Sequence, residues 1–362
     1  METLSIAPMI QWTDRYWRFL IRQITHQTLL YTEMTSDVSL VHNVNNFDDF
    51  LGHDPSVELP LAVQLGGSVP EQLAEAAYLC ESYGAFHEIN INAGCPSTKA
   101  KRGGFGAELM LNPENMKQII YAVKRRVSRT DVTVKCRIGV TGRDSKSELI
   151  EFISACKAGG VDRMIIHARK CELKGLSPAQ NRSIPPLRHD VVHEMAEIFP
   201  DMNFILNGGI TTFDEVDSHL SLDNPLYKTP VHGVMIGREA YRNIWMMVDA
   251  DRRYFHKHKD RNSLKGNEIR LAHDRHLTRR EVAYKYLDYA LHCQEMDCFG
   301  SRTPNLAKPL HNFFVGYEES RSYKRRLDDL LKSEVPKGVS VDEIFWAAVQ
   351  DTIPSHVLDD IV

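Results

Sequence analysis

Over the first two thirds of the chain, short apolar runs alternate with longer stretches in which apolar residues recur at helical spacing. Apolar runs bounded by turn residues are typical of buried strands. We expect strands at residues 4–7, 29–32, 61–65, 88–92, 132–138, 163–167, 203–207 and 233–236. Helical patterns lie between them, for example at residues 71–83, 113–128, 146–158 and 186–198.

Strands that alternate with helices predict a parallel sheet covered by helices. Eight such units with continuously apolar strands favour an α/β fold of the TIM (β/α)8 barrel type. An open doubly wound sheet is the alternative. It is weakened because no G-x-G-x-x-G motif follows the first expected strand.

The pattern changes after about residue 250, where only helical periodicity continues. Helices are expected at residues 273–293, 306–315, 319–331 and 341–351. The chain therefore divides into a barrel domain over residues 1–250 and a smaller all-helical domain over residues 251–362. Lys and Arg crowd the helical part with acids between them, a pattern that fits either a solvated helix face or a groove for a phosphate backbone.

Composition restricts the class of protein. Of the 362 residues, 43% are hydrophobic and 25% charged, which is ordinary for a globular chain. The net charge of −4 gives no overall case for nucleic acid. No apolar run approaches the roughly 20 residues that span a bilayer. The seven cysteines form no C-x-x-C pair and no zinc-finger spacing. We expect a cytoplasmic protein with no membrane segment and no metal; for an organellar protein, this chain would lack the presequence.

In a barrel, chemistry lies at the carboxyl ends of the strands. Nearly every expected strand end here is polar or rich in glycine, although glycine alone at such a turn is often only backbone geometry. The ends are Ala7-Pro8-Met9, Glu33-Met34, Gln64-Leu65-Gly66-Gly67, Asn92-Ala93-Gly94-Cys95, Lys135-Cys136-Arg137, His167-Ala168-Arg169, Asn207-Gly208-Gly209 and Gly237-Arg238.

The last two ends are typical of a phosphate site, in which glycine-rich loops offer backbone N–H groups and an Arg offers a guanidinium fork. Ordinary left-handed turns are the alternative for either loop alone. Three other residues stay ambiguous. Lys135 would meet either an anionic cofactor or a core acid such as Glu33. Gln64 would pair either with the edge of a planar ring or with neighbouring backbone, and His167 is either a ligand or a satisfied core residue.

One thiol lies where an expected strand stops and a basic, glycine-rich loop starts. Cys95 is followed by Lys99, Lys101 and Arg102, and the next helix is expected to begin at Asn112-Pro113. Nearby positive charge favours the thiolate, so Cys95 is a candidate acid or nucleophile. A buried structural cysteine is the alternative.

Taken together, these motifs resemble the tRNA-dihydrouridine synthase family, most closely its bacterial-type A subfamily. The matching segments are APM (7–9), QLGG (64–67), ININAGCPS (89–97), GGFGAELM (103–110), VTVKCRIG (132–139), IIHARK (165–170), KGLSPAQNR (174–182), IPPL (184–187), NGGI (207–210) and GR (237–238). One departure is in the helical part. Where the subfamily has an Arg-His-Met element, this chain has Lys308 and Pro309, and Lys does not replace Arg in bidentate contacts.

The resemblance implies FMN on the barrel, NADPH as reductant and a uracil of the tRNA D-loop as substrate. Separately, we expect the protein to be a monomer. The FMN residues it implies are Ala7, Pro8, Met9, Gln64, Lys135, His167, Asn207, Gly208, Gly209, Gly237 and Arg238. Catalytic Cys95 and Asn92 would face the uracil. Lys174, Asn181 and Arg182 match the family's tRNA-contacting stretch, and the positive charge of Lys99 and Arg102 leads us to expect that they contact tRNA as well.

In the implied reaction, flavin N5 supplies a hydride, Cys95 supplies a proton to C5 of uracil, and Lys135 stabilises negative charge on the reduced flavin. The loop over residues 98–105 would close over the substrate. Two other functions compete. A flavin reductase of small molecules would use the same barrel end, but it would have no task for the basic helices. A non-catalytic RNA-binding protein would have no use for Cys95.

Overall fold

The computed structural model describes residues 4–43, 45–255 and 277–362. They fall into two compact units, each of which is described by itself. The first unit comprises Met1–Gln11, Leu29–Pro55 and Leu59–Gly237, and the second comprises Trp12–Thr28, Ser56–Glu58 and Arg238–Val362. The division expected at residue 250 concerns catalytic and tRNA-binding roles, and it stays a prediction.

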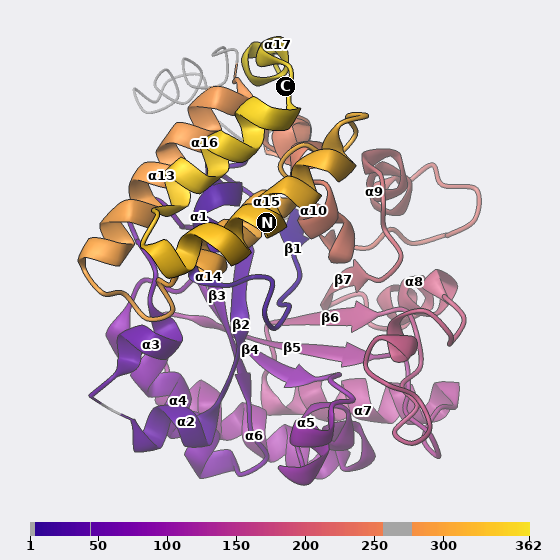
Figure 1. Cartoon of the computed structure of the whole chain (residues 1–362). Coiled ribbons are helices and arrows are strands. Elements are labelled where there is room, and N and C mark those ends of the chain that lie inside the picture. The colour runs from indigo at the N-terminus through magenta and orange to yellow at the C-terminus, as the bar shows by residue number, and fades with distance from the viewer. Residues whose placement is uncertain (1–3, 44, 256–276) are drawn as a thin grey trace, which may run out of the picture. The chain divides into compact units, whose positions relative to one another are not determined.

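The first unit is built on one sheet of eight parallel strands (Figure 1). They are β1 (Leu4–Ile6), β2 (Leu30–Ser36), β3 (Leu61–Gly66), β4 (Glu88–Ala93), β5 (Asp131–Arg137), β6 (Arg163–His167), β7 (Asn203–Asn207) and β8 (Gly233–Ile236). Their order is β1-β8-β7-β6-β5-β4-β3-β2, and a parallel bridge between Ser5 and Leu29 brings β1 to the β2 edge. The predicted TIM-type barrel is therefore confirmed.

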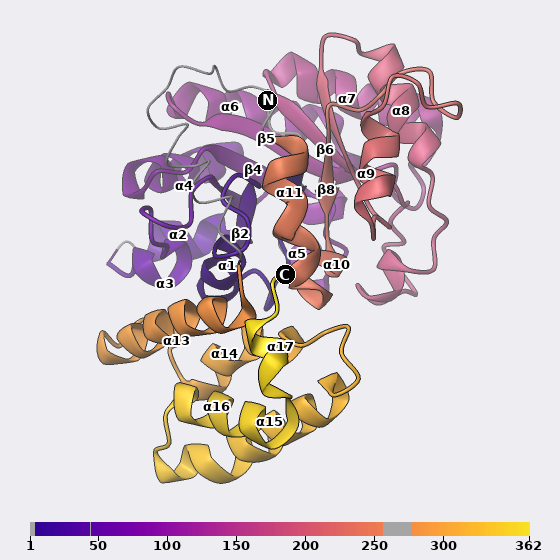
Figure 2. The ribbon, with the colours of Figure 1, turned by 90° about the horizontal axis from the view of Figure 1, so that it is seen from above.

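Helices follow the strands around the outside of this sheet (Figures 1 and 2). They are α2 (Asp37–His42), α3 (Phe47–Leu51), α4 (Pro70–Tyr83), α5 (Thr98–Arg102), α6 (Pro113–Arg126), α7 (Lys146–Gly159), α8 (His189–Ile198) and α9 (Phe213–Leu220). Helix α6 begins as predicted, with the Asn112 side chain accepting a hydrogen bond from the Asn115 N–H at 3.0 Å and Pro113 in the first turn.

The expected start of the helix at residue 186 is wrong, because α8 begins three residues later, at His189. The Arg188 N–H donates to the Ala168 carbonyl at 2.8 Å, and the backbone of Arg188 is not helical. The Pro185-Pro186 pair also holds the chain extended before this point. His189 therefore lies beside the end of β6 at the very start of its helix.

Polar residues fill the amino end of the barrel interior. Glu88 is buried at the start of β4 and accepts a hydrogen bond from the Tyr31 hydroxyl at 2.5 Å. It also accepts from the Thr133 hydroxyl and forms an ion pair with Arg163. Apolar side chains form the core cluster, which consists of Ala7, Leu29, Tyr31, Ala62, Ile165, Ile205 and Met235.

The second unit is helical. Its helices are α1 (Arg15–Arg22), α10 (Arg238–Arg242), α11 (Ala250–Tyr254), α13 (Arg279–Glu295), α14 (Thr303–Ala307), α15 (Ser320–Glu334), α16 (Val341–Thr352) and α17 (Ser355–Asp359). Helix α1 is held to its unit by the buried Arg18–Glu58 ion pair at 2.7 Å and by the Thr25 hydroxyl, which donates to Asp251 at 2.6 Å. Residues 273–276 of the helix expected at 273–293 lie outside the described residues.

One helix predicted in this unit, at residues 306–315, is wrong. The chain forms the short helix α14 and then a 3-10 turn over Lys308–Asn312. Pro309 has no N–H to donate and restricts the residue before it, so the α-helix ends at Ala307. The helices expected at residues 319–331 and 341–351 are present as α15 and α16.

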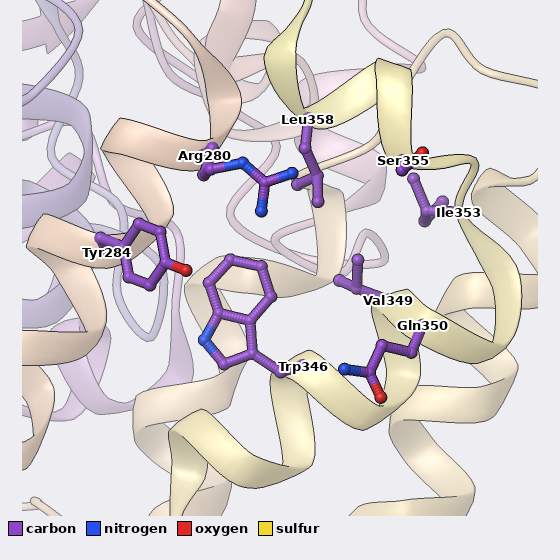
Figure 3. A pocket seen from close by; sticks show the side chains of 8 residues that line it. All are labelled: Arg280, Tyr284, Trp346, Val349, Gln350, Ile353, Ser355 and Leu358. Carbon is purple, nitrogen blue, oxygen red and sulfur yellow. The ribbon is translucent and has the colours of Figure 1, made fainter.

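The second unit also has a pocket of about 480 Å³ between α13, α16 and α17 (Figure 3). The Tyr284 and Trp346 rings form part of its wall, with centroids 4.9 Å apart. Arg280 also lines it and makes a two-bond contact with Asp359 at 2.6 and 2.9 Å. Because that carboxylate already balances the guanidinium, the pocket carries no unbalanced cation from Arg280 for an anion to use.

None of the helices in the described part of the chain is long and apolar enough to cross a membrane. Within residues 4–43, 45–255 and 277–362, no group of three or more His, Cys, Asp or Glu side chains could hold a metal ion.

Candidate active site

Four neighbouring strands bring the predicted site residues together at their carboxyl ends. Asn92 on β4 lies beside Lys135 on β5, and His167 on β6 lies beside Asn207 on β7. The Lys135 ammonium reaches across the barrel end and donates to Asn207 Oδ1 at 2.8 Å. Residues that are 115 positions apart in the sequence, Asn92 and Asn207, therefore lie at one rim.

Asn92 shapes the turn that carries Cys95. Its Oδ1 accepts hydrogen bonds from the N–H groups of Gly94 at 3.1 Å and Cys95 at 3.0 Å. Its Nδ2 donates to Gln64 Oε1 at 2.8 Å, and Gln64 in turn donates to Asn90 at 2.7 Å. The amide of the buried Gln64 is thus engaged by two asparagine side chains rather than by backbone.

The Cys95 thiol is partly exposed and lies 3.3 Å from the Ser97 hydroxyl. Among the seven cysteines, only Cys95 and Cys298 are not buried. Cys95 is therefore the accessible thiol at the barrel rim, and the alternative of a buried structural cysteine does not hold for it.

The expected loop after Cys95 is wrong in part, because residues 98–102 form helix α5. Ser97 caps this helix by accepting a hydrogen bond from the Ala100 N–H at 3.2 Å. Lys99 and Arg102 are exposed on it. Gly106 has a φ of +68°, and a Cβ there would lie 2.5 Å from the Cys95 carbonyl oxygen, so this close approach requires glycine.

Two cations lie at this rim with neutral partners. Burial, reinforced by the nearby Arg137 guanidinium, lowers the pKa of Lys135 to about 7. Burial also lowers the pKa of Arg137, which donates to the carbonyls of Gly94 at 3.3 Å and Asn181 at 2.9 Å. The alternative ion pair of Lys135 with Glu33 is not present: Glu33 accepts from the Gln11 N–H, and Lys135 donates to Asn207. In the described part of the chain, no carboxylate pairs with Lys135 or Arg137.

The segment after β6 carries three residues that are expected to contact tRNA: Lys174, Asn181 and Arg182. Asn181 is fully buried; its amide donates to the Glu172 and Ser177 carbonyls and accepts from the Glu172 N–H at 2.7 Å. Asn181 therefore holds the fold of this loop, and its expected contact with tRNA stays a prediction. Lys174 is exposed. Burial lowers the pKa of the partly buried Arg182.

The glycines after β7 form a tight cradle. Gly208 and Gly209 have φ angles of +111° and +79°. A Cβ on Gly208 would lie 3.1 Å from the His167 ring, and one on Gly209 would lie 2.4 Å from a Leu187 methyl group. The positive φ angles and these close contacts together favour glycine at both positions.

The first strand reaches the same rim. The Ala7 N–H donates to the Ile236 carbonyl at 2.8 Å, so Ala7, Pro8 and Met9 leave the sheet beside Gly237. A Cβ added to Gly237 would meet only Ala7, at 4.0 Å, which leaves space at this point. Arg238 follows directly as the first residue of α10.

Sequence reasoning assigned no role to Arg137, Ser97 and His189. Arg137 stands at a strand end beside Cys136, a position that could have singled it out. Ser97 has the signature of a helix cap, three residues before Ala100. The His189 Nε2 lies 2.7 Å from the Gly208 carbonyl, a contact that no local pattern announces.

Comparison with known proteins identifies the family of this chain. The family model described as dihydrouridine synthase (Dus) matches residues 5–334. A protein of Pseudomonas putida, named tRNA-dihydrouridine(20/20a) synthase, is 46% identical over 69% of this chain and 71% of its own length. Proteins with the same name from Synechocystis sp. (37% identical; 93% of this chain and 92% of that one) and Shewanella oneidensis (36%; 96% and 94%) are similar over nearly all of it.

A solved structure of a 2-naphthoyl-CoA reductase complex is similar with a TM-score of 0.50. It is 8% identical and is matched over 69% of this chain, which spans half the length of that reductase. At this identity the likeness shows the barrel fold alone.

Proposed function

The chain belongs to the dihydrouridine synthase family, and we propose that it reduces the C5–C6 double bond of a uridine in the D-loop of tRNA. The names of its relatives support tRNA as the substrate. The observation that carries the proposal is the accessible Cys95 thiol at a rim where Lys135 and Arg137 have no carboxylate partner among the described residues.

FMN fits the residues of this rim. The N–H groups of Gly208 and Gly209 donate no hydrogen bond within the described part of the chain, and Lys135 offers a cation whose partner is a neutral amide. The residues we propose to hold it are Ala7, Pro8, Met9, Gln64, Lys135, His167, Asn207, Gly208, Gly209, Gly237 and Arg238. When bound, FMN supplies the hydride that reduces the uracil ring, and NADPH is the proposed source of its electrons.

The residues of the chain then have distinct tasks. Cys95 donates a proton to C5 of uracil, which requires the thiol form at that moment. Asn92 and Arg137 hold the turn that aims the thiol, through the Gly94 N–H and carbonyl respectively. The target base must leave its stack to reach this rim. Lys99, Arg102, Lys174 and Arg182 are proposed to contact tRNA, and the protein is proposed to act as a monomer in the cytoplasm.

The test is to reduce the enzyme and follow its reoxidation by tRNA that lacks dihydrouridine. Wild type and Cys298→Ala, the matched control at the other exposed thiol, are expected to reoxidise at the same rate, with dihydrouridine appearing in the tRNA. Free uridine is expected to leave the enzyme reduced. Rapid reoxidation by free uridine and none by tRNA would instead make the protein a reductase of small molecules.

A further inference from the structure

We propose that His189 is a positioning residue that aims the Gly209 N–H group at the phosphate of the bound flavin. The inference rests on the proposed function, because it concerns the same cofactor. His189 is not proposed to touch the cofactor itself; it acts through the backbone of Gly208 and Gly209.

The first step is that the hydrogen bond between His189 and the Gly208 carbonyl has only one possible direction. His189 Nε2 lies 2.7 Å from the carbonyl oxygen of Gly208. A carbonyl oxygen only accepts, so Nε2 carries the proton and donates it. The ring is placed there because α8 begins at His189, after the Arg188 N–H has bonded to the Ala168 carbonyl.

The second step follows from the planar peptide. In a trans peptide the C=O and the next N–H point in opposite directions. With the Gly208 carbonyl turned towards His189, the Gly209 N–H points away from α8. In the described part of the chain the N–H groups of Gly208 and Gly209 donate no hydrogen bond. Unpaired backbone donors at a glycine loop are the groups that bind phosphate oxygens.

The third step is that His189 has little freedom to turn away. The His219 ring meets it edge to face at a centroid distance of 4.7 Å. His219 is held in turn by His193, with Nδ1 and Nε2 3.0 Å apart, and His193 Nδ1 donates to the Thr229 carbonyl at 2.7 Å. The two helices that carry these rings, α8 and α9, lie on the same side of β7 and β8 (Figure 2). The rings of His193 and His219 therefore hold His189 in place beside the Gly208 carbonyl.

The experiment compares two substitutions and two ligands. His189→Phe keeps a ring of similar size without the donor, and His189→Gln keeps an amide donor near the place of Nε2. FMN and riboflavin, which lacks the phosphate, are titrated into the full chain after its flavin is removed. Loss of one hydrogen bond at a charged ligand's loop predicts an FMN dissociation constant about tenfold higher in His189→Phe. His189→Gln is expected to restore it to within about threefold of wild type, and riboflavin affinity is expected to be equal in all three proteins.

Two results would overturn the inference while leaving the proposed function in place. One is wild-type FMN affinity in His189→Phe, and the other is an equal loss of affinity for FMN and riboflavin, which signals a merely structural role. Failure of the wild-type chain to bind either flavin would overturn the proposed cofactor and this inference with it. If His189→Phe does not fold, His189→Asn takes its place, because the shorter amide cannot reach Gly208.

Discussion

The two ends of the barrel interior are built by the same strands and solve the problem of buried charge in opposite ways. At the amino end, Glu88 on β4 pairs with Arg163 on β6 and accepts hydrogen bonds from Tyr31 and Thr133. At the carboxyl end, the half-buried Lys135 of β5 donates to a neutral amide and has no carboxylate partner among the described residues. A buried charge without an opposite charge is costly. At the amino end Glu88 has an opposite charge, whereas at the carboxyl end the partner of Lys135 is neutral.

A chain of amides joins these ends through the middle of the barrel. Asn90 contacts Glu88 at 3.4 Å, Gln64 donates to Asn90 at 2.7 Å, and Asn92 donates to Gln64 at 2.8 Å. The last of these residues holds the turn of Cys95. The ion pair expected to matter for stability and the thiol of the proposed reaction therefore lie at opposite ends of one continuous hydrogen-bonded network, and substitutions at the two ends should separate the two effects.

The largest effect is expected at the carboxyl end, from Cys95→Ala. A general acid contributes roughly 10²–10⁴-fold, so reoxidation of the reduced enzyme by tRNA should slow by about that factor. FMN content, reduction by NADPH and the melting temperature should stay as in wild type, because none of them needs the thiol. Stopped-flow flavin absorbance measures both half-reactions. A wild-type rate of reoxidation would remove Cys95 as the proton donor.

The mirror experiment is Glu88→Gln at the amino end. Removing one member of a buried ion pair strands the other, and the expected loss of unfolding free energy is about 3–5 kcal/mol. The rate of tRNA reduction per folded molecule should not change. Denaturant titration measures the first quantity. The matched control is Glu75→Gln, which breaks the exposed pair with Arg126 and should cost less than about 1 kcal/mol. Equal losses in the two variants would contradict the comparison.

The fold and the meeting of the site residues were predictable from the sequence for one physical reason. Parallel strands place their carboxyl ends together, so Asn92, Lys135 and Asn207 could be assigned to one rim from strand order alone. What the sequence could not show are hydrogen bonds that form only in the folded chain. Asn181 looks like a surface residue in a polar segment, yet backbone groups of its own loop bury its amide.

The same limit explains why His189 was missed. Its helix begins where the Arg188 N–H finds the Ala168 carbonyl, a partner 20 residues earlier in the chain. Helical periodicity alone carried the predicted start back to residue 186. Helix α5 was missed for the opposite reason. Its cap Ser97 and its helix-forming Ala, Lys and Arg residues are local signals for a helix. The neighbouring glycines, which favour a loop, outweighed these signals in the prediction.

A pH titration sharpens the comparison at Lys135. Burial lowers its pKa to about 7 in the free protein, and a bound anion favours the charged form. Below that pH the ammonium is already present, so FMN affinity has the full benefit of Lys135 and does not change with pH. Above it, binding must first return the proton, so affinity should fall by up to about tenfold per pH unit. Lys135→Met should bind FMN more weakly and lose this dependence. A wild-type curve parallel to that of Lys135→Met between roughly pH 7 and 9 would show that Lys135 does not face the anion.

The smallest effect is expected outside the barrel interior, on helix α5, where charge is already solvated. Lys99 and Arg102 are exposed, whereas the Lys101 ammonium has a long contact of 3.5 Å with the Leu173 carbonyl. A cation that neutralises one phosphate releases about one counterion, so Lys99→Ala and Arg102→Ala should each flatten the log–log salt dependence of tRNA binding by about one unit. Fluorescence anisotropy between roughly 50 and 200 mM salt measures that slope.

Arg125→Ala is the matched control, because Arg125 is equally exposed but lies on α6. It should leave the slope unchanged. All three variants should have the melting temperature of wild type, since exposed side chains contribute little to stability. If Lys99→Ala and Arg102→Ala kept the wild-type slope while Arg125→Ala flattened it, tRNA would lie over the outer helices rather than over α5. The cofactor would then be the only anion proposed to bind at the carboxyl rim, and the positive charge of α5 would have to be explained without tRNA.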